Sequence, residues 1–383
     1  GFDTAPRNDP MTVIGGLSGE ALAGRGEGAR EAMVAKYGGT KESEEAVARA
    51  LQWLAAHQLP DGGWSFMHNL APGCRRRCGN PGDPRFAQAR NAATGLALLP
   101  FLGAGQTHKE GRYQKVVQSG LYFLINRQDR RSGSLWDSSG QMYSHGIASI
   151  ALCEAYAMTH DKMLFEPAQK AINFIVYAQD PFGGGWRYVP QQPGDTSILG
   201  WQIMALKSGH LAYLVVPPAT VKKASGFLDS VQSPDGANYG YDKPGEGPST
   251  EATTAIGVLC RMLMGRKKSD PDLELGVAWL SRRGPNSSLY YDYYATQVLR
   301  HWEGEPWTKW NAVMRDELVN LQAKRGHELG SWFIMEEGNH LARHNQIGGR
   351  LYCTALAAMI LEVYYRHMPI YAKQSVESDF PLE

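Results

Sequence analysis

Carboxyl groups, a histidine and a cysteine occupy equivalent positions at the expected starts of several apolar helices. When the apolar segments are aligned by their Ala/Leu pattern, His145, Asp195 and Cys353 match, and Asn91 and Glu251 lie nearby. Free N–H groups at a helix start favour anions, and carboxyl groups together with histidine can exchange protons with a ligand. The same residue types also cap helices, so capping is the alternative interpretation at each position. The candidate catalytic residues are Asp195, Glu251, Asp292 and His145.

Aromatic residues are concentrated in the same apolar segments, above all in the run Tyr290-Tyr291-Asp292-Tyr293-Tyr294. Aromatic faces can stabilise a carbocation, stack on a sugar or simply fill a core. A concave apolar site with a few convergent polar groups is typical of a small-molecule pocket. The sequence therefore predicts a cavity for a hydrophobic small-molecule ligand, lined by Asn91, Trp201, Tyr290, Tyr291, Tyr293, Tyr352 and Cys353.

Two cysteines are candidate metal ligands. Cys74 and Cys78 lie in a loop rich in glycine, proline and arginine, where they form either a short disulfide or, with His68, half of a metal site. The other three cysteines lie inside apolar helical runs and are interpreted as small buried residues; they are Cys153, Cys260 and Cys353.

A second candidate metal site lies near the C-terminus. Glu336, His340 and His344 would share one face if this segment were helical, and that spacing suits zinc. Gly338 weakens such a helix, so a polar loop without a metal is the alternative interpretation. These patterns identify no particular cofactor.

A repeated unit positions these residues. It consists of an amphipathic helix, a glutamine, a turn rich in Gly and Asp, an aromatic residue and a more apolar helix. A helix that is apolar all round is buried on both sides, so the second helix of each unit belongs inside the first. Neither terminal unit has the polar face that would cap an open solenoid. We predict an all-α fold, an (α/α)6 toroid of six helical hairpins with a central cavity; the turns begin at Gln58, Gln128, Gln179, Gln232 and Gln322, with a degenerate copy at Gly284.

Composition limits the class of protein. The 383 residues are 43% hydrophobic and 20% charged, as in ordinary globular chains. Lys and Arg number 39 against 38 Asp and Glu, so no global field attracts nucleic acid, and no transmembrane segment is predicted. We expect a Gly-rich linker or N-terminal arm over residues 1–40, a single toroid domain over 41–368 and a C-terminal tail over 369–383. Because the chain starts without Met, we also expect neighbouring domains in a longer parent chain; the compartment is not indicated.

The string from Gln58 to Trp64, Gln-Leu-Pro-Asp-Gly-Gly-Trp, resembles the QW repeat of squalene–hopene cyclases and protein prenyltransferase β subunits. The resemblance extends from about Lys41 to Tyr365, and more narrowly the chain is similar to bacterial proteins with prenyltransferase/squalene-oxidase repeats. It implies an α/α toroid and a terpenoid ligand. In such a repeat we expect the glutamine to bind backbone groups at the helix end and the tryptophan to pack on the next unit.

The chain departs from the catalytic patterns of both families. Class II terpene cyclases supply an acid from Asp-x-Asp-Asp-Thr-Ala, whereas this chain retains only the final acid, Asp195, and has Gly194 at the proton-donor position. Prenyltransferases hold zinc with Asp-x-Cys and Tyr-His-Thr, whereas the matching stretches here end at Asp292 and contain Tyr352-Cys353-Thr354. We therefore expect a toroid without the usual acid or zinc ligands that binds a hydrophobic ligand such as an isoprenoid. The alternatives are an enzyme that uses rim carboxylates on a glycan or prenyl-like substrate, and a non-catalytic interaction module of a larger protein.

Overall fold

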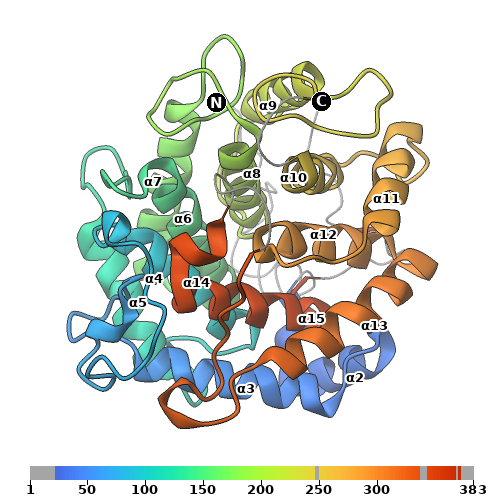
Figure 1. The fold of residues 1–383 in the computed structure, drawn as a ribbon. Helices are drawn as coiled ribbons and strands as arrows, with labels where there is room; N and C mark the ends of the chain where they lie inside the picture. The colour runs from blue at the N-terminus through green and yellow to red at the C-terminus, as the bar shows by residue number, and fades with distance from the viewer. Residues whose placement is uncertain (1–21, 246–249, 337–342, 368–369, 372–383) are drawn as a thin grey trace.

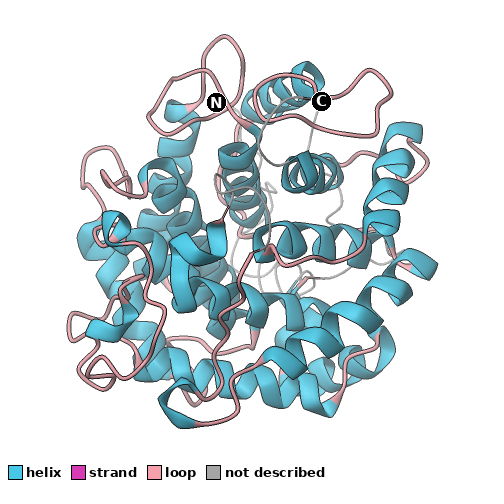
Figure 2. Ribbon diagram, viewed as in Figure 1, coloured by secondary structure: helices cyan, strands magenta, loops and turns pink. Residues whose placement is uncertain are grey.

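The computed structural model describes residues 22–245, 250–336, 343–367 and 370–371. This part of the chain contains fourteen α-helices, four short 3-10 helices and no β-strand (Figure 2). One isolated bridge joins Gln232 and Tyr239 across the turn of the fourth repeat. Among these residues no helix combines the length and apolar character that a membrane span requires.

The helices form two layers, one inside the other (Figure 1). The inner helices are almost wholly buried, which explains why their sequences are apolar on every side. The outer layer consists of α3 (Lys41–Ala56), α5 (Gln114–Arg127), α7 (Lys162–Ala178), α9 (Pro218–Val231), α11 (Pro271–Arg283) and α13 (Gly304–Leu321). The inner layer consists of α4 (Arg90–Gly103), α6 (Gln141–Thr159), α8 (Thr196–Leu211), α10 (Thr250–Leu263), α12 (Leu289–Trp302) and α14 (His344–Leu361).

The two layers close into a ring. Each inner helix contacts the next inner helix in the chain, and α14 completes the circle by packing against α4. In the outer layer α13 reaches α3, so the first and last hairpins lie side by side (Figure 1). The predicted all-α toroid of six hairpins is confirmed. Closure removes the two ends at which an open solenoid would expose its apolar core.

A glutamine ties five of the six turns to the following hairpin. Gln58 Nε2 donates to the carbonyl of Gly62 in its own turn at 2.7 Å and to the carbonyl of Val116 in the next outer helix at 2.9 Å. The last glutamine, Gln322, bonds to Ala46 and so ties the sixth hairpin to the first. Gln128 and Gln179 make the same two bonds, one within the turn and one to the next outer helix. Gln232 does so too, but its acceptor in the next outer helix is a carboxylate oxygen of Asp272.

The tryptophans of the turns also bond to the helix that precedes them. The indole N–H of Trp64 donates to the Leu54 carbonyl of its own outer helix at 2.8 Å, and Trp186 does the same to Ile175. Each indole therefore fastens the turn back onto the helix that precedes it. The Trp64 ring also packs on the next hairpin, as expected, because a Cβ added at Gly120 of α5 would lie 2.8 Å from its Cζ3 atom.

A buried ion network covers the end of the ring where the inner helices finish. Arg25 Nη1 lies 2.9 Å from Glu154 Oε2, and Arg366 contacts the same carboxylate at 3.0 Å. Arg366 also pairs with Glu362 at 3.2 Å and donates to the Leu99 carbonyl at 2.7 Å. We refer to Arg25, Glu154, Glu362 and Arg366 as the ion network.

The ion network shows that the chain before α3 belongs to the packed structure. The predicted domain start at Lys41 coincides with the first residue of α3, but α2 (Glu27–Tyr37) precedes it and packs against α15 (Val363–Arg366). The carbonyl of Tyr37 accepts from the Trp307 indole at 3.0 Å. The described residues of this segment, from 22 onward, therefore form a packed arm rather than a linker.

Candidate functional site

Asp195 lies at the other end of the ring, where the inner helices begin. It is the N-cap of α8, and its Oδ1 accepts from the Ile198 N–H at 2.8 Å. The side chain is fully buried; its Oδ2 makes no hydrogen bond of normal geometry to a described residue, although the nearby Tyr241 hydroxyl interacts with the carboxyl and lowers its pKa. Burial raises the pKa of Asp195 to about 6 although the Ile198 N–H opposes the shift. Asp195 therefore caps its helix through one carboxyl oxygen, while the other oxygen faces the Tyr241 hydroxyl without a bond of normal geometry.

Gly194 shows why the preceding position carries no acid. A Cβ added there would lie 2.6 Å from the Gly185 Cα and 2.9 Å from the backbone nitrogen of Trp186. Both neighbours are main-chain atoms of the third turn, so neither can move aside as a flexible side chain could. The turn therefore leaves no room for a side chain at this position.

A chain of hydroxyl groups joins three inner helices beside Asp195. The hydroxyl of Tyr143 on α6 lies 2.7 Å from Ser197 Oγ on α8, which lies 2.7 Å from the hydroxyl of Tyr290 on α12. Burial raises the pKa of Tyr143 and Tyr290, and Asp195 adds to both shifts. These phenols are therefore neutral and exchange hydrogen bonds rather than charge.

An aromatic stack continues from this chain. Trp201 on α8 lies nearly parallel to Tyr293, with ring centroids 5.7 Å apart and 15° between the planes, and it stacks on Tyr290 at 6.5 Å. Tyr294 meets the Trp201 ring edge-on at 5.8 Å. Offset and edge-on pairs of this kind are the favourable aromatic geometries. We refer to these rings together with the hydroxyl chain as the tyrosine cluster: Tyr143, Ser197, Trp201, Tyr290, Tyr293 and Tyr294.

One predicted cavity residue, Tyr291, lies away from this cluster. Its hydroxyl donates to the Gly284 carbonyl at 3.1 Å, and its ring meets Trp310 of the outer helix α13. The helical period of α12 explains the difference, because Tyr290, Tyr293 and Tyr294 share one helix face and Tyr291 does not. The sequence run alone could not assign the four tyrosines to faces.

Two further candidate carboxyls meet through an asparagine. Asn286 donates its backbone N–H to Asp292 Oδ1 at 3.1 Å and its side-chain Nδ2 to Glu251 Oε2 at 2.8 Å. Glu251 is also ion-paired with Arg283 and is partly exposed. Asp292 is fully buried, its Oδ2 has no described partner, and burial raises its pKa well above the ordinary value. The structure thus brings Glu251 and Asp292 together but places Asp195 in a different group.

Glu336 extends the group around Asp292. Its Oε2 accepts from the Asn345 N–H at 2.8 Å, and burial raises its pKa. Cys353 is buried beside it, with its sulfur 3.7 Å from the Asn345 carbonyl. The Tyr352 hydroxyl is buried and has no described partner, and Tyr290 and Glu336 act electrostatically on it. Glu336 was predicted only as a metal ligand and Asn345 not at all, and only the polar character of Asn345 in an apolar region could have indicated it.

His145 and Asn91 form hydrogen bonds with the backbone of the second turn, at Leu135. His145 Nδ1 accepts from the Leu135 N–H at 3.0 Å, and its Nε2 lies 3.0 Å from the Ala171 carbonyl. Asn91 Nδ2 donates to the Leu135 carbonyl at 2.9 Å. Burial lowers the pKa of His145 to about 4, so the ring is neutral. Both ring nitrogens are occupied by backbone groups, an arrangement suited to positioning the second turn.

The candidate metal ligands separate into two groups. Cys74 and Cys78 are buried free thiols close to His57 and His327, and His68 packs its ring on Trp53 instead. His344 begins α14 and lies with its ring 4.9 Å from that of Tyr290. His340 lies outside the described residues. Glu336 lies in a non-helical segment, so the helical face expected for Glu336 and His344 is absent from the described residues.

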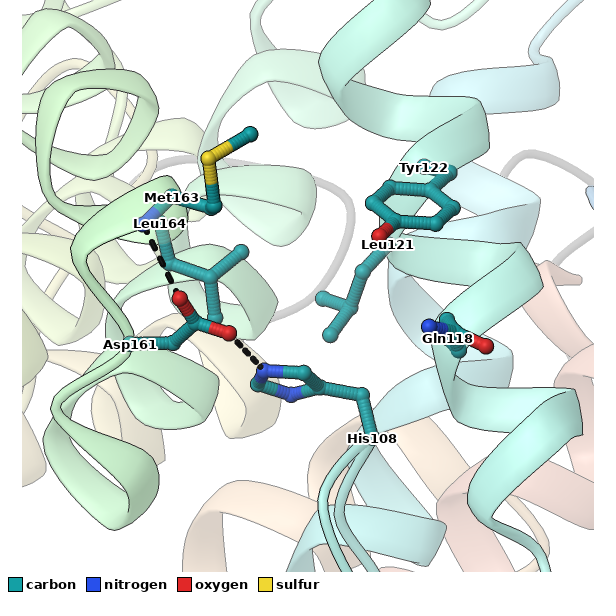
Figure 3. Close-up of a pocket in the computed structure, with 7 residues that line it drawn as sticks. All are labelled: His108, Gln118, Leu121, Tyr122, Asp161, Met163 and Leu164. Atoms are coloured by element: carbon teal, nitrogen blue, oxygen red, sulfur yellow. Dashed lines mark hydrogen bonds and ion pairs between the residues drawn. The ribbon is translucent and has the colours of Figure 1, made fainter.

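Figure 3 shows a small pocket between the outer helices α5 and α7, lined by no residue of the tyrosine cluster. His108 Nε2 lies 2.9 Å from Asp161 Oδ2, and α5 and α7 supply the remaining walls. Its volume is about 20 Å³, the space of a single water molecule, so it is not a substrate site.

Comparison with known proteins places this geometry among helical toroids. No family model matches the chain. The chain is 26% identical over 275 residues to the terpene cyclase–glycosyl transferase fusion protein fsoA of Humicola fuscoatra, an alignment that covers 68% of this chain and 16% of the relative. The chain thus spans about one-sixth of the length of that curated relative.

Solved structures support the fold more broadly. The type II terpene cyclase MstE from Scytonema matches with a TM-score of 0.56 at 15% identity, covering 83% of this chain and 97% of that one. The GH76A α-1,6-mannanase from Salegentibacter sp. HEL1_6 matches with a TM-score of 0.57 at 10% identity, covering 84% and 98%. At these identities the likeness concerns the fold alone. The fold is that of the terpene-cyclase-like helical toroids, and glycan-cleaving enzymes share it.

Proposed function

We propose that this toroid binds a prenyl-type hydrophobic ligand at the end of the ring where the inner helices begin, against the tyrosine cluster. Trp201 and Tyr293 offer stacked aromatic faces that suit an unsaturated hydrocarbon chain. A solved structure of MstE, with a TM-score of 0.52 and 16% identity to this chain, contains geranylgeranyl dihydroxybenzoate as substrate. This precedent favours a prenyl ligand with a polar head over a purely apolar one.

The observation that carries the proposal is a set of buried polar atoms without described partners around Tyr290. They are the Tyr352 hydroxyl and the second carboxyl oxygen of Asp195. Buried polar groups are normally hydrogen-bonded, so unpaired ones clustered beside aromatic rings indicate a place for a polar group from outside. A prenyl chain with a hydroxyl or carbonyl head would occupy the rings and pair with these atoms.

Ligand titration tests this proposal. Geranylgeraniol added to the purified protein should bind and appear as an added mass in native mass spectrometry. Trp201→Leu should weaken binding roughly tenfold or more, because a buried aromatic face contributes on the order of 1–2 kcal/mol. The matched control is Trp279→Leu, a partly buried tryptophan of the outer helix α11, which should bind as the unchanged protein does. Equal weakening in both variants, or no binding at all, would contradict the proposal, and the second result would favour an interaction module.

Acid chemistry at Asp195 is the second candidate, because its buried carboxyl lies beside the tyrosine cluster and burial keeps it protonated at pH values below about 6. A protonated carboxyl can transfer its proton to an alkene carbon: the O–H bond breaks, a C–H bond forms, and a carboxylate and a carbocation remain. Nearby aromatic faces stabilise such a cation until it loses a proton. Asp195→Asn should then abolish product formation from a prenyl substrate while binding persists. Release of sugar from α-1,6-mannotriose by the unchanged protein would instead support the glycan alternative.

A further inference from the structure

Four side chains with nitrogen or sulfur donors converge where the first and last hairpins meet. His57, Cys74, Cys78 and His327 each offer one donor atom, and these atoms all lie within 4.8 Å of one another. Cys78 Sγ lies 3.4 Å from His57 Nε2 and 3.2 Å from His327 Nδ1. We propose that these four residues bind a zinc ion, in a structural site that fastens the ring at its closure.

The spacing of the donor atoms suits a tetrahedral zinc site. With zinc–sulfur bonds of about 2.3 Å and zinc–nitrogen bonds of about 2.0–2.1 Å, the ligand atoms of a tetrahedron stand roughly 3.3–3.8 Å apart. The two measured distances to Cys78 Sγ, 3.4 Å and 3.2 Å, lie at or just below that range. A set of two thiols and two imidazoles without a carboxylate selects zinc over magnesium or calcium, which prefer oxygen.

Both histidines are oriented by backbone carbonyls. His57 Nδ1 lies 2.7 Å from the Trp53 carbonyl, and His327 Nε2 lies 3.1 Å from the Gly73 carbonyl. A carbonyl only accepts, so these nitrogens carry the protons and the opposite nitrogens direct their lone pairs at Cys78. Metal-binding histidines in proteins are held in this way by their second nitrogen.

The cysteine loop is shaped to present both sulfurs at one point. Arg75 and Arg76, between the cysteines, adopt left-handed backbone conformations with φ of 50° and 59°. The resulting turn lets the Cys78 N–H donate to Cys74 Sγ at 3.4 Å. Both thiols are almost completely buried. A closed set of four ligands without an open position is typical of structural zinc sites rather than catalytic ones.

The ligands come from the two ends of the repeat series. His57 follows the last residue of α3, the cysteines lie in the long connection to α4, and His327 lies in the turn after α13. Around them Glu328 accepts from the Gly79 N–H at 2.8 Å and pairs with Arg350 at 3.0 Å. The metal therefore joins hairpins one and six at the place where Gln322 also bonds across the closure. This role explains why the first turn is longer than the others.

The metal content of the purified full chain tests the assignment. Protein expressed with zinc should carry about one equivalent, seen as a mass difference between native and denatured spectra. After chelation, Co²⁺ added to the reduced protein should give the ligand-field absorption of a tetrahedral site with thiolate charge-transfer bands. Zinc added back should raise the melting temperature, because it binds the folded chain only.

Variants test the ligand set. Cys78→Ser and His327→Gln should lower zinc affinity at least tenfold, whereas Cys153→Ser, which changes a buried thiol of α6, should keep the full equivalent. If a ligand variant does not fold, the Co²⁺ titration of the unchanged protein still shows whether a tetrahedral metal site is present. An unchanged protein that binds neither zinc nor Co²⁺ would overturn the proposal. Full zinc content in Cys78→Ser, or a Cys74–Cys78 disulfide with no metal, would also overturn it.

Discussion

The two ends of the inner ring differ in whether their buried carboxyl groups form ion pairs. Where the inner helices finish, Glu154 lies between Arg25 and Arg366, so each charge of the ion network faces an opposite one. Burial alone would raise the pKa of Glu154, but the two arginines outweigh it and the pKa is lowered. Where the inner helices begin, Asp195 and Asp292 are as deeply buried and make no ion pair with a described residue.

This difference indicates which end has a function beyond holding the fold. Unpaired buried carboxyls are costly, and raised pKa values without a partner are characteristic of sites that act on a ligand. In the ion network every residue has an ion-pair partner within the protein, although Arg25 Nη2, Glu362 Oε1 and Arg366 Nε make no hydrogen bond to a described residue. The end with the ion network therefore serves as the support of the ring, and the opposite end is the candidate site.

Breaking the ion network should have the largest effect. Glu154→Gln removes the carboxylate that pairs with both Arg25 and Arg366. Losing one member of a buried ion pair lowers the free energy of unfolding by about 3–5 kcal/mol. Urea unfolding followed by circular dichroism should show this loss. The control is Glu305→Gln, which removes the exposed pair with Lys309 and should leave stability unchanged. A loss no larger than that of the control would refute the support role.

For Asp195 we expect the opposite effect on folding stability: removal of its charge should stabilise the protein. Its folded pKa of about 6 lies above the ordinary value of 3.8, so folding favours the protonated carboxyl and stability falls as pH rises from about 4 to about 6. Asn keeps the capping oxygen but carries no charge. Asp195→Asn should therefore become more stable relative to the unchanged protein by about 2 kcal/mol between about pH 4 and about pH 8.

Melting temperatures of both proteins across this pH range measure the effect. Asp129→Asn is the control, because hydrogen bonds from the Ser132 N–H and hydroxyl lower the pKa of Asp129, away from the range tested. Its stability difference from the unchanged protein should stay constant over the same pH range. If the stability difference between Asp195→Asn and the unchanged protein did not change with pH, the Asp195 carboxyl would be paired or hydrated. The contrast between the two ends of the ring would then disappear.

The repeat pattern predicted the architecture because it depends on local chemistry. Hydrophobic periodicity separated inner from outer helices, and the spacing of the glutamines fixed the number of hairpins. The ring closure, which pairs Gln322 with Ala46, followed from the absence of polar caps rather than from any pairwise signal. Asp195 was identified for the same reason, because an acid before an apolar helix is a local feature.

Contacts between distant segments could not be predicted. His57 and His327 are separated by almost the whole repeat series, and no spacing rule relates them, so His68 was chosen as the partner of the cysteines instead. The direction in which Tyr291 points, toward Trp310 rather than the tyrosine cluster, depended on the exact rotation of α12 about its axis. Arg25 lay in a segment expected to be a linker or arm, and only the tertiary structure shows its contact with Glu154. Sequence reasoning thus identified the helical elements, whereas contacts between distant segments required the tertiary structure.

A substitution at Gly194 tests whether the candidate site has been closed to the cyclase acid by packing. Gly194→Ala forces a Cβ to within 2.6 Å of the Gly185 Cα, and overpacking of this kind costs about 1–3 kcal/mol. Gly226→Ala is the matched control, because a Cβ there meets nothing within 4 Å and the helix α9 should gain roughly 0.5–1 kcal/mol. Denaturant unfolding of the two variants should therefore shift in opposite directions. If Gly194→Ala were tolerated as well as Gly226→Ala, the turn would have room for a side chain, and the absence of an acid at this position would have no steric cause.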